Sequence, residues 1–294
     1  MVETVLGVIG GSGVYDIDGL EDARWIKVDT PWGAPSDEFL QGTLGDQKLV
    51  FLPRHGRGHH ISPTGLNARA NIDAMKRLGV TDIVSVGAVG SLREDLAPGM
   101  FVLVDQYIDR SHLRTKSFFG DGLVAHISLA HPACPRLTDV IETTLQNEDI
   151  AYHRGGTYLV MEGPQFSTYA ESQLYRSWGC DVIGMTAMPE ARLAREAEIC
   201  YVTVAMVTDY DCWHDGHDNV TVDSILKVLH ANADNARQLV RALAPSVDRH
   251  GELCYAGCDR ALDHALITAP EKRDPELIAR LDAVAGRVLG NGAD

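Results

Sequence analysis

Apolar positions along the chain follow two spacings that alternate up to about residue 245. Short runs rich in β-branched residues are typical of buried strands, and they occur at 5–11, 48–55, 82–90, 101–108, 157–163, 181–186 and 199–211. Segments with apolar residues at helical spacing lie between and after them, at 135–148, 168–178, 189–198, 222–243 and 275–289. The alternation predicts an α/β fold, a single domain with a central mixed β-sheet flanked by helices.

One further helix is expected before residue 80. Ser62 and Pro63 make a good N-cap and first-turn pair, and Gly79 is a typical stop. The apolar residues at helical spacing in this segment are Leu66, Ala70, Ile72, Met75 and Leu78. Residues 246–272 are irregular and polar. We therefore predict a main domain over 1–245 and a divergent C-terminal extension over 246–294 that ends in a helix.

Composition and charge exclude several classes of partner. The chain has 294 residues, with 26 Lys and Arg against 41 Asp and Glu, so its net charge is −15. This charge argues against a surface for nucleic acid or for an anionic membrane. The first residues do not resemble a secretory leader, and no apolar run reaches the length of a transmembrane helix. The six cysteines are scattered, which suits reduced thiols and predicts a cytoplasmic protein.

Two of the cysteines, Cys254 and Cys258, are close in sequence. A metal or disulfide role is disfavoured for them, because no nearby residue completes a four-ligand site. The sequence therefore predicts no metal site.

Ligands of α/β sheets gather beyond the carboxyl ends of strands, so these are the places to search. Gly10–Gly13 forms a glycine-rich turn whose amides, with the Ser12 hydroxyl, can approach an anion, although a plain tight turn explains the residues equally well. The segment 54–60 holds two arginines and three histidines. This cluster favours phosphate over zinc, since no zinc-ligand spacing accompanies it.

Later strand ends add further candidates. Ala88 lies in a glycine-bracketed segment, and Glu162 and Phe166 suit a sugar hydroxyl and a flat ring. Asp209 and Asp211 follow a long apolar run and are candidate acid or base groups, because buried carboxylates need partners or a proton. Their alternative is a loop with Asx-turn hydrogen bonds.

These segments, taken together and in this order, carry a family resemblance. From about Val5 to Pro245 the chain resembles the trimeric branch of the purine nucleoside phosphorylase superfamily, and within it the phosphorylases of S-methyl-5'-thioadenosine. The matching segments include IGGSG, DTPWGAPSD, RHGRGH, GSLRE, MEGPQFS, MTAMPEARLAREAEICY and TDYDCW.

The resemblance implies phosphorolysis of S-methyl-5'-thioadenosine to adenine and 5-methylthioribose 1-phosphate. Inorganic phosphate is then a co-substrate, and no metal or organic cofactor is needed. The residues implied to bind phosphate are Ser12, Arg54, His55, Ala88 and Thr186.

The resemblance also implies how the nucleoside is held. Asp209 is expected to donate a hydrogen bond to N7 of the purine, and Asp211 to lie near the exocyclic amine. Phe166 is expected to pack on the base, and the Met185 backbone to meet the ribose hydroxyls. The 5' substituent is implied to contact Val222 and Ile225, together with His126 of a neighbouring subunit in a homotrimer.

Two positions depart from the animal relatives of this branch. Gly87 replaces a Thr that contributes a hydroxyl near phosphate and ribose, and Gly184 replaces an Asn. Other functions stay open at this point: a phosphorylase of 6-oxopurine nucleosides or of methylthioinosine, and a non-catalytic nucleoside-binding protein.

Overall fold

The computed structural model describes residues 3–11, 13–214 and 222–290, and residues 222–227 enter only as part of a helix. Within this part of the chain eleven strands form one sheet. In chain order they are β1 (Val5–Gly10), β2 (Glu21–Ile26), β3 (Phe39–Leu44), β4 (Gln47–Pro53), β5 (Asp82–Ser91), β6 (Phe101–Val104), β7 (Gln106–Asp109), β8 (Tyr152–Arg154), β9 (Thr157–Val160), β10 (Val182–Gly184) and β11 (Cys200–Asp209).

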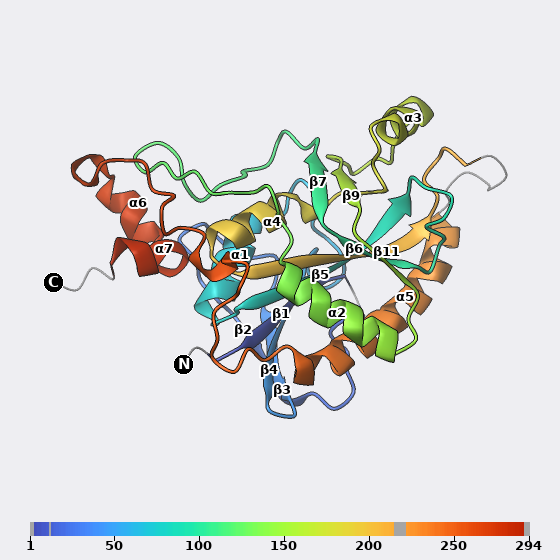
Figure 1. Cartoon of the computed structure of the whole chain (residues 1–294), viewed down its shortest axis with the longest axis horizontal. Helices are drawn as coiled ribbons and strands as arrows, with labels where there is room; N and C mark the ends of the chain where they lie inside the picture. The colour runs from blue at the N-terminus through green and yellow to red at the C-terminus, as the bar shows by residue number, and fades with distance from the viewer. Residues whose placement is uncertain (1–2, 12, 215–221, 291–294) are drawn as a thin grey trace.

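Seven α-helices are described with the sheet (Figure 1). They are α1 (Ala68–Arg77), α2 (Pro135–Asn147), α3 (Tyr169–Ser177), α4 (Ala187–Glu196), α5 (Val222–Leu243), α6 (Pro275–Arg280) and α7 (Asp282–Leu289). The predicted α/β class with a mixed sheet is confirmed. Strand β5 pairs in parallel with β1 and β11 but antiparallel with β10.

The helices cover both faces of the sheet because side chains alternate along its central strands. On β5, Ile83 packs into one apolar cluster with Met75 of α1 and Leu193 of α4, while the next residue, Val84, packs into another with α2 and α5. Figure 1 shows α1 beside α4, and α2 beside α5. None of the helices in the described ranges has the length and apolarity to span a bilayer.

The carboxyl ends of the central strands meet at one edge of the sheet. Strand β1 lies between β4 and β5, and β5 pairs with β11. Strand β4 ends at Pro53, and the amide of the next residue, Arg54, donates to the Gly10 carbonyl at the end of β1 (2.9 Å). The groups predicted to carry the chemistry therefore leave neighbouring strands at the same edge.

Several predicted boundaries are wrong. The first helix starts at Ala68 and not after Ser62, because the Asn67 side chain caps it and Ser62–Gly65 forms a separate turn. The predicted strand 101–108 breaks at Asp105, since β6 pairs with β8 and β11 whereas β7 pairs with β9. Strands β2, β3 and β8 were not predicted. The predicted helices 168–178 and 189–198 are present, the first with a capping box at Thr168.

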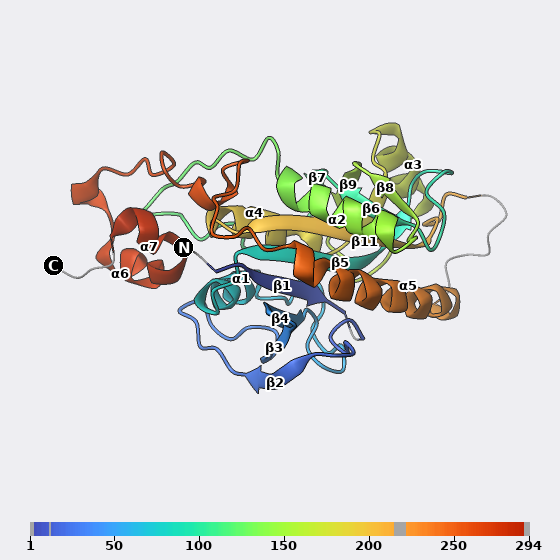
Figure 2. The same ribbon diagram turned by 60° about the horizontal axis from the view of Figure 1, so that its bottom comes forward.

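The C-terminal segment lies against the domain. The predicted helix 275–289 is divided at Leu281 into α6 and α7, and Leu281 and Val284 are buried against the cluster that contains α1. Arg287 pairs with the buried Glu198 (2.6 Å). Figure 2 shows α7 beside α1 and α6 next to α7, at the end of the molecule opposite the carboxyl end of β11.

Candidate active site

Arg54 is held in a buried polar network at the end of β4. Its Nε donates to Glu190 Oε1 (2.6 Å), and both side chains are 3% exposed. The remaining guanidinium nitrogens donate to the Ser85 hydroxyl (2.6 Å) and the Val86 carbonyl (3.0 Å) of β5. Such a network fixes the plane of the guanidinium before any ligand binds.

Glu190 is a site residue that the sequence analysis missed. It lies in α4, is 2% exposed, and accepts hydrogen bonds from Ser85 (2.8 Å) and Tyr201 (3.1 Å) as well as from Arg54. The signal that could have found it is an acidic residue directly after the Met-Pro pair of MTAMPE, since a buried Glu in an apolar helix needs a cationic partner.

Arg54 and Thr186 face a small space beside Gly87. A Cβ built on Gly87 would lie 3.5 Å from Arg54 Nη1 and 3.8 Å from Thr186 Oγ1. The next residue, Ala88, is exposed although it lies in a central strand of the sheet. Strand β5 is therefore open to solvent at Ala88. Arg54 and Thr186 come together beside Gly87, and Ala88 is the next residue of the strand. A guanidinium and a hydroxyl at one place suit an anion.

Tyr158 explains the glycine at position 184. A Cβ on Gly184 would overlap the Tyr158 hydroxyl, so this chain has no room for the Asn that the family resemblance implies for the animal enzymes. Burial raises the pKa of Tyr158, while the charge of Arg54 and the hydrogen bonds with Thr186 act in the opposite direction. Tyr158 therefore remains a neutral hydroxyl beside Thr186.

His55 is neutral around pH 7 in this structure. Burial and the adjacent charge of Arg54 lower the pKa of His55 to about 4. Its Nδ1 lies 2.8 Å from the Ile61 carbonyl, which assigns the proton to Nδ1 and leaves Nε2 as an acceptor. The His59 ring stacks on it, with centroids 4.3 Å apart. The neutral His55 can therefore accept a hydrogen bond from a hydrogen phosphate at Nε2, but it does not supply a positive charge.

Asp209 and Asp211 lie at the carboxyl end of β11, next to β5. The Asp211 amide donates to Asp209 Oδ1 (2.8 Å), and the Thr208 hydroxyl to Asp209 Oδ2 (2.7 Å). A Cβ on Gly90 would lie 3.0 Å from Asp209 Oδ1, so the glycine leaves room for this turn. The Asx-type hydrogen bond of the alternative interpretation is present, and it orients the carboxyl group.

Both carboxyl groups hold protons more tightly than an exposed Asp. Burial raises the pKa of Asp209, although its hydrogen bonds with Thr208 and the Asp211 amide partly offset this effect. Burial also raises the pKa of Asp211, and the neighbouring charge of Asp209 raises it further. A carboxyl group with a raised pKa can serve as a hydrogen-bond donor or general acid.

The carboxylate of Glu162 is occupied by hydrogen bonds from the surrounding loops. It accepts hydrogen bonds from Thr64 Oγ1 (2.6 Å), the His112 amide (2.6 Å) and Arg114 Nε (3.1 Å). Burial would raise the pKa of Glu162, but these donors lower it to about 2. The interpretation of Glu162 as a partner of sugar hydroxyls is therefore wrong, because its oxygens already hold the loop.

Arg114 is a second residue that the sequence analysis missed. It is almost buried and donates to the Met185 and Met188 carbonyls, which ties the loop after β10 to the Glu162 loop. The Met185 carbonyl is thus occupied. Phe166, in the same region, is 54% exposed and is available to a flat ligand.

Four predicted residues remain. Ser12 and the side chains of Val222 and Ile225 lie outside the described residues. His126 is exposed, and its amide donates to the Ala265 carbonyl of the C-terminal segment (2.8 Å).

Known proteins resemble this chain over nearly its whole length. An S-methyl-5'-thioadenosine phosphorylase from Cereibacter sphaeroides is 65% identical over 98% of this chain and 99% of its own. One from Rhodospirillum rubrum is 61% identical, with 98% of each chain covered. Alignments of 288 residues include most of the segment after residue 245.

Solved structures agree with these relatives. A methylthioadenosine phosphorylase from an Antarctic soil metagenomic library superposes with a TM-score of 0.90 at 45% identity, covering 97% of this chain and 99% of its own. A methylthioadenosine phosphorylase from Schistosoma mansoni in complex with tubercidin has a TM-score of 0.79 at 34% identity, covering 87% and 95%. The family model described as the phosphorylase superfamily matches residues 5–245. With the fold, the strand-end site and these matches in agreement, the chain belongs to the phosphorylase superfamily.

Proposed function

We propose that this chain catalyses the phosphorolysis of S-methyl-5'-thioadenosine, which yields adenine and 5-methylthioribose 1-phosphate. The observation that carries the proposal is the juxtaposition of two kinds of group on adjacent strands. On β5, the space beside Gly87 is faced by Arg54 and Thr186 and suits an anion. On the adjacent strand β11, burial raises the pKa of Asp209. The names of the relatives at 61% to 65% identity support this substrate.

Phosphate would bind in the space between Arg54, Thr186 and the Ala88 backbone, with Ser12 and the neutral His55 completing its contacts. Arg54 supplies the positive charge, and Glu190 fixes its direction. A phosphate held below the ribose attacks the anomeric carbon as the bond to the purine nitrogen breaks. Fixing the nucleophile in this way replaces a random encounter in solution.

The departing base takes up the electron pair of the broken bond. A protonated Asp209 donates to purine N7 and stabilises that charge as it develops. Asp211 would lie near the exocyclic amine, the exposed Phe166 would pack on the purine, and the Met185 backbone would meet the ribose. Phosphate is a co-substrate in this scheme, and no metal or organic cofactor takes part in it.

The 5' substituent would bind against Val222 and Ile225, with His126 supplied by a neighbouring subunit. His126 is exposed, and its amide binds the Ala265 carbonyl of the C-terminal segment, so its side chain is open to a neighbouring subunit. We therefore propose a homotrimer in which active sites lie between subunits. The six cysteines are all free thiols in the structure, which favours a cytoplasmic location.

The test is a substrate panel of S-methyl-5'-thioadenosine, adenosine, inosine and methylthioinosine, each assayed for released base with and without phosphate. We expect phosphate-dependent release of adenine, with S-methyl-5'-thioadenosine the best substrate. Release of base without phosphate contradicts the mechanism, and a preference for inosine or methylthioinosine contradicts the substrate. Sedimentation at the assay concentration tests the assembly, since an active monomer contradicts the trimer.

A further inference from the structure

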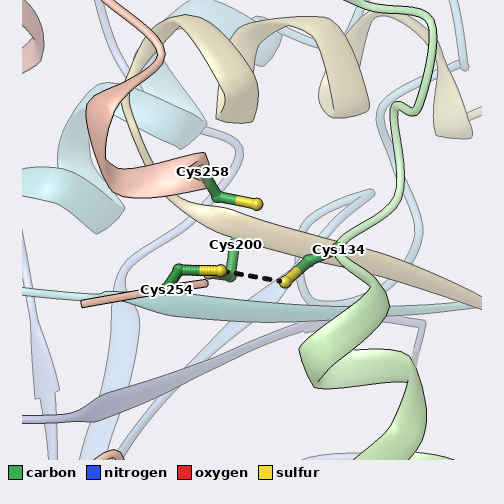
Figure 3. A group of neighbouring side chains, drawn as sticks. All are labelled: Cys134, Cys200, Cys254 and Cys258. Atoms are coloured by element: carbon green, nitrogen blue, oxygen red, sulfur yellow. Dashed lines mark hydrogen bonds between the residues drawn. The ribbon is translucent and has the colours of Figure 1, made fainter. Parts of the chain in front are cut away.

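Four cysteines from distant parts of the chain meet in the interior, as Figure 3 shows. They form what we call the cysteine quartet: Cys134, Cys200, Cys254 and Cys258. All four Sγ atoms lie within 4.8 Å of one another, and all four side chains are buried. The quartet joins the N-cap of α2, the first residue of β11 and the C-terminal segment. The prediction from the sequence that no residue completes a four-ligand site with Cys254 and Cys258 is therefore wrong, because Cys134 and Cys200 lie beside them in the fold.

The spacing of the sulfur atoms fits one tetrahedral metal ion. Thiolates that bind zinc at about 2.3 Å in a tetrahedron lie about 3.8 Å from each other. The Sγ atoms of Cys134 and Cys254 are 3.6 Å apart, far more than the roughly 2.05 Å of a disulfide. A central ion satisfies all four sulfur atoms at once.

The loop from Cys254 to Cys258 has the form of a metal-binding turn. Three residues separate the two cysteines, a spacing found in zinc loops. Gly257 has a left-handed backbone (φ 70°), and its amide donates to the Cys254 carbonyl (2.8 Å). The Cys254 amide donates to Asp259 (2.7 Å), which Arg249 also contacts (3.0 Å). These hydrogen bonds orient the loop, as hydrogen bonds to metal-binding residues do in known metal sites.

The surroundings of the quartet favour thiolates. Cys134 is the N-cap of α2, where the helix dipole stabilises negative charge, and no side-chain cap bond occupies that end. Arg136 in the first turn of α2 contacts Cys200, while it also pairs with the buried Asp82. The positive end of the α2 dipole and Arg136 thus lie beside Cys134 and Cys200, the two cysteines of the main domain.

We propose that the cysteine quartet binds one structural Zn²⁺ ion through four thiolates. Four protein ligands leave no open position, as in structural rather than catalytic zinc sites. Cys200 begins β11 and Asp209 ends it, so about 30 Å of strand separates the ion from the candidate active site. The ion fastens the C-terminal segment to the domain, and this role is independent of the proposed reaction.

The first experiment uses the full-length wild-type protein. It is purified without chelator from cells supplied with zinc, and its metal content is measured by mass spectrometry. We expect about one zinc per chain after dialysis. The protein is then denatured with chelator but without reductant and alkylated, and all six cysteines should react. Less than about a tenth of a zinc per chain, iron in its place, or a disulfide within the quartet overturns the proposal.

Variants locate the ion. Cys258→Ser should retain less than about a tenth of the wild-type zinc after dialysis, and its Tm should no longer respond to chelator. Cys180→Ser is the control, since Cys180 is also buried but lies outside the quartet. It should keep the wild-type zinc content, and a loss equal to that of Cys258→Ser contradicts the assignment.

A metal titration covers the case in which Cys258→Ser does not fold. Full-length wild-type protein is stripped of metal and titrated with Co²⁺ alone. Charge-transfer absorption from thiolate and the d–d bands of a tetrahedral site are expected at about one equivalent. Absence of these bands overturns the proposal without the use of any variant.

Discussion

Arg54 and Glu190 form a buried ion pair, with Nε and Oε1 2.6 Å apart, although 136 residues separate them in the sequence. The pair joins the end of β4 to α4 and directs the guanidinium toward the space beside Gly87. Glu190 touches no atom of the proposed reaction. We interpret it as a positioning residue that acts through Arg54.

Glu190→Gln tests this interpretation. The amide keeps the shape of the side chain but leaves the Arg54 charge without a buried counter-charge, so the guanidinium should turn away from the phosphate space. We expect the KM for phosphate to rise about tenfold, as for one lost charge-assisted hydrogen bond, with a much smaller change in the KM for nucleoside. Steady-state kinetics with each substrate varied in turn measures the two values.

Glu198→Gln is the matched control for Glu190→Gln. Glu198 is also buried and paired with an arginine, Arg287, but it lies beside the C-terminal segment. Both variants should have a lower Tm, whereas only Glu190→Gln should weaken phosphate binding. Equal changes in the KM for phosphate would show that the effect of Glu190 is general destabilisation.

Gly87→Thr should improve phosphate binding. The added Cβ would lie in ordinary contact with Arg54 Nη1 (3.5 Å) and Thr186 Oγ1 (3.8 Å), so a Cβ at this position displaces neither atom. Its hydroxyl adds a donor at the edge of the phosphate space, and the KM for phosphate should fall about threefold. Gly87→Val has the same shape without the hydroxyl and should raise that KM. If both variants act alike, the hydroxyl plays no part.

Protonation of His55 should destabilise the fold in mild acid. The pKa of His55 is lowered to about 4 in the folded chain, from about 6.5 in an unfolded one. Between these values the unfolded state binds more protons, so the stability associated with His55 falls as the pH drops from about 6.5 to about 4. Thermal unfolding without phosphate should show a larger decrease in Tm over this range for wild type than for His55→Gln. Parallel curves for the two proteins would contradict the shifted pKa.

Much of the fold could be predicted because its strands and helices carry local signals. The runs that became β5 and β11 are long and apolar, and Thr168 with Glu171 forms a capping box that marks the start of α3. Helix α1 was misplaced because Ser62 and Pro63 are an equally good local start. The Asn67 cap prevails through contacts with Trp32 and Ala34, which are distant in sequence.

The candidate site could be predicted only in part, because local sequence signals mark strand ends but do not reveal contacts between distant residues. Arg54, Thr186 and Asp209 follow strands and could be found by searching strand ends. Glu190 pairs with Arg54, 136 residues away, and Arg114 with the Met185 carbonyl, 71 residues away, and no local pattern reveals such pairs. The cysteine quartet is the extreme case, since Cys134 and Cys254 are 120 residues apart and only the folded chain brings them together.

Asp209 determines which base the site prefers, if its protonated carboxyl is the group that meets the purine. A 6-aminopurine presents an acceptor at N7 and a donor at its exocyclic amine, and a neutral carboxyl group can match both. A 6-oxopurine presents acceptors at both places, and an amide suits it better. Asp209→Asn should therefore lower kcat/KM for S-methyl-5'-thioadenosine about a hundredfold while raising the relative rate on inosine. Because an amide still donates to N7, Asp209→Ala should be slower than Asp209→Asn.

The pH profile gives a second readout of the role of Asp209. Burial raises the pKa of Asp209, so the donor form is complete below that raised pKa and is lost as the pH rises through it. The decline of kcat/KM at higher pH that belongs to this group should be present in wild type and absent in Asp209→Asn. An unchanged preference between adenine and hypoxanthine nucleosides, together with an unchanged profile, would mean that Asp209 only structures the turn to Asp211.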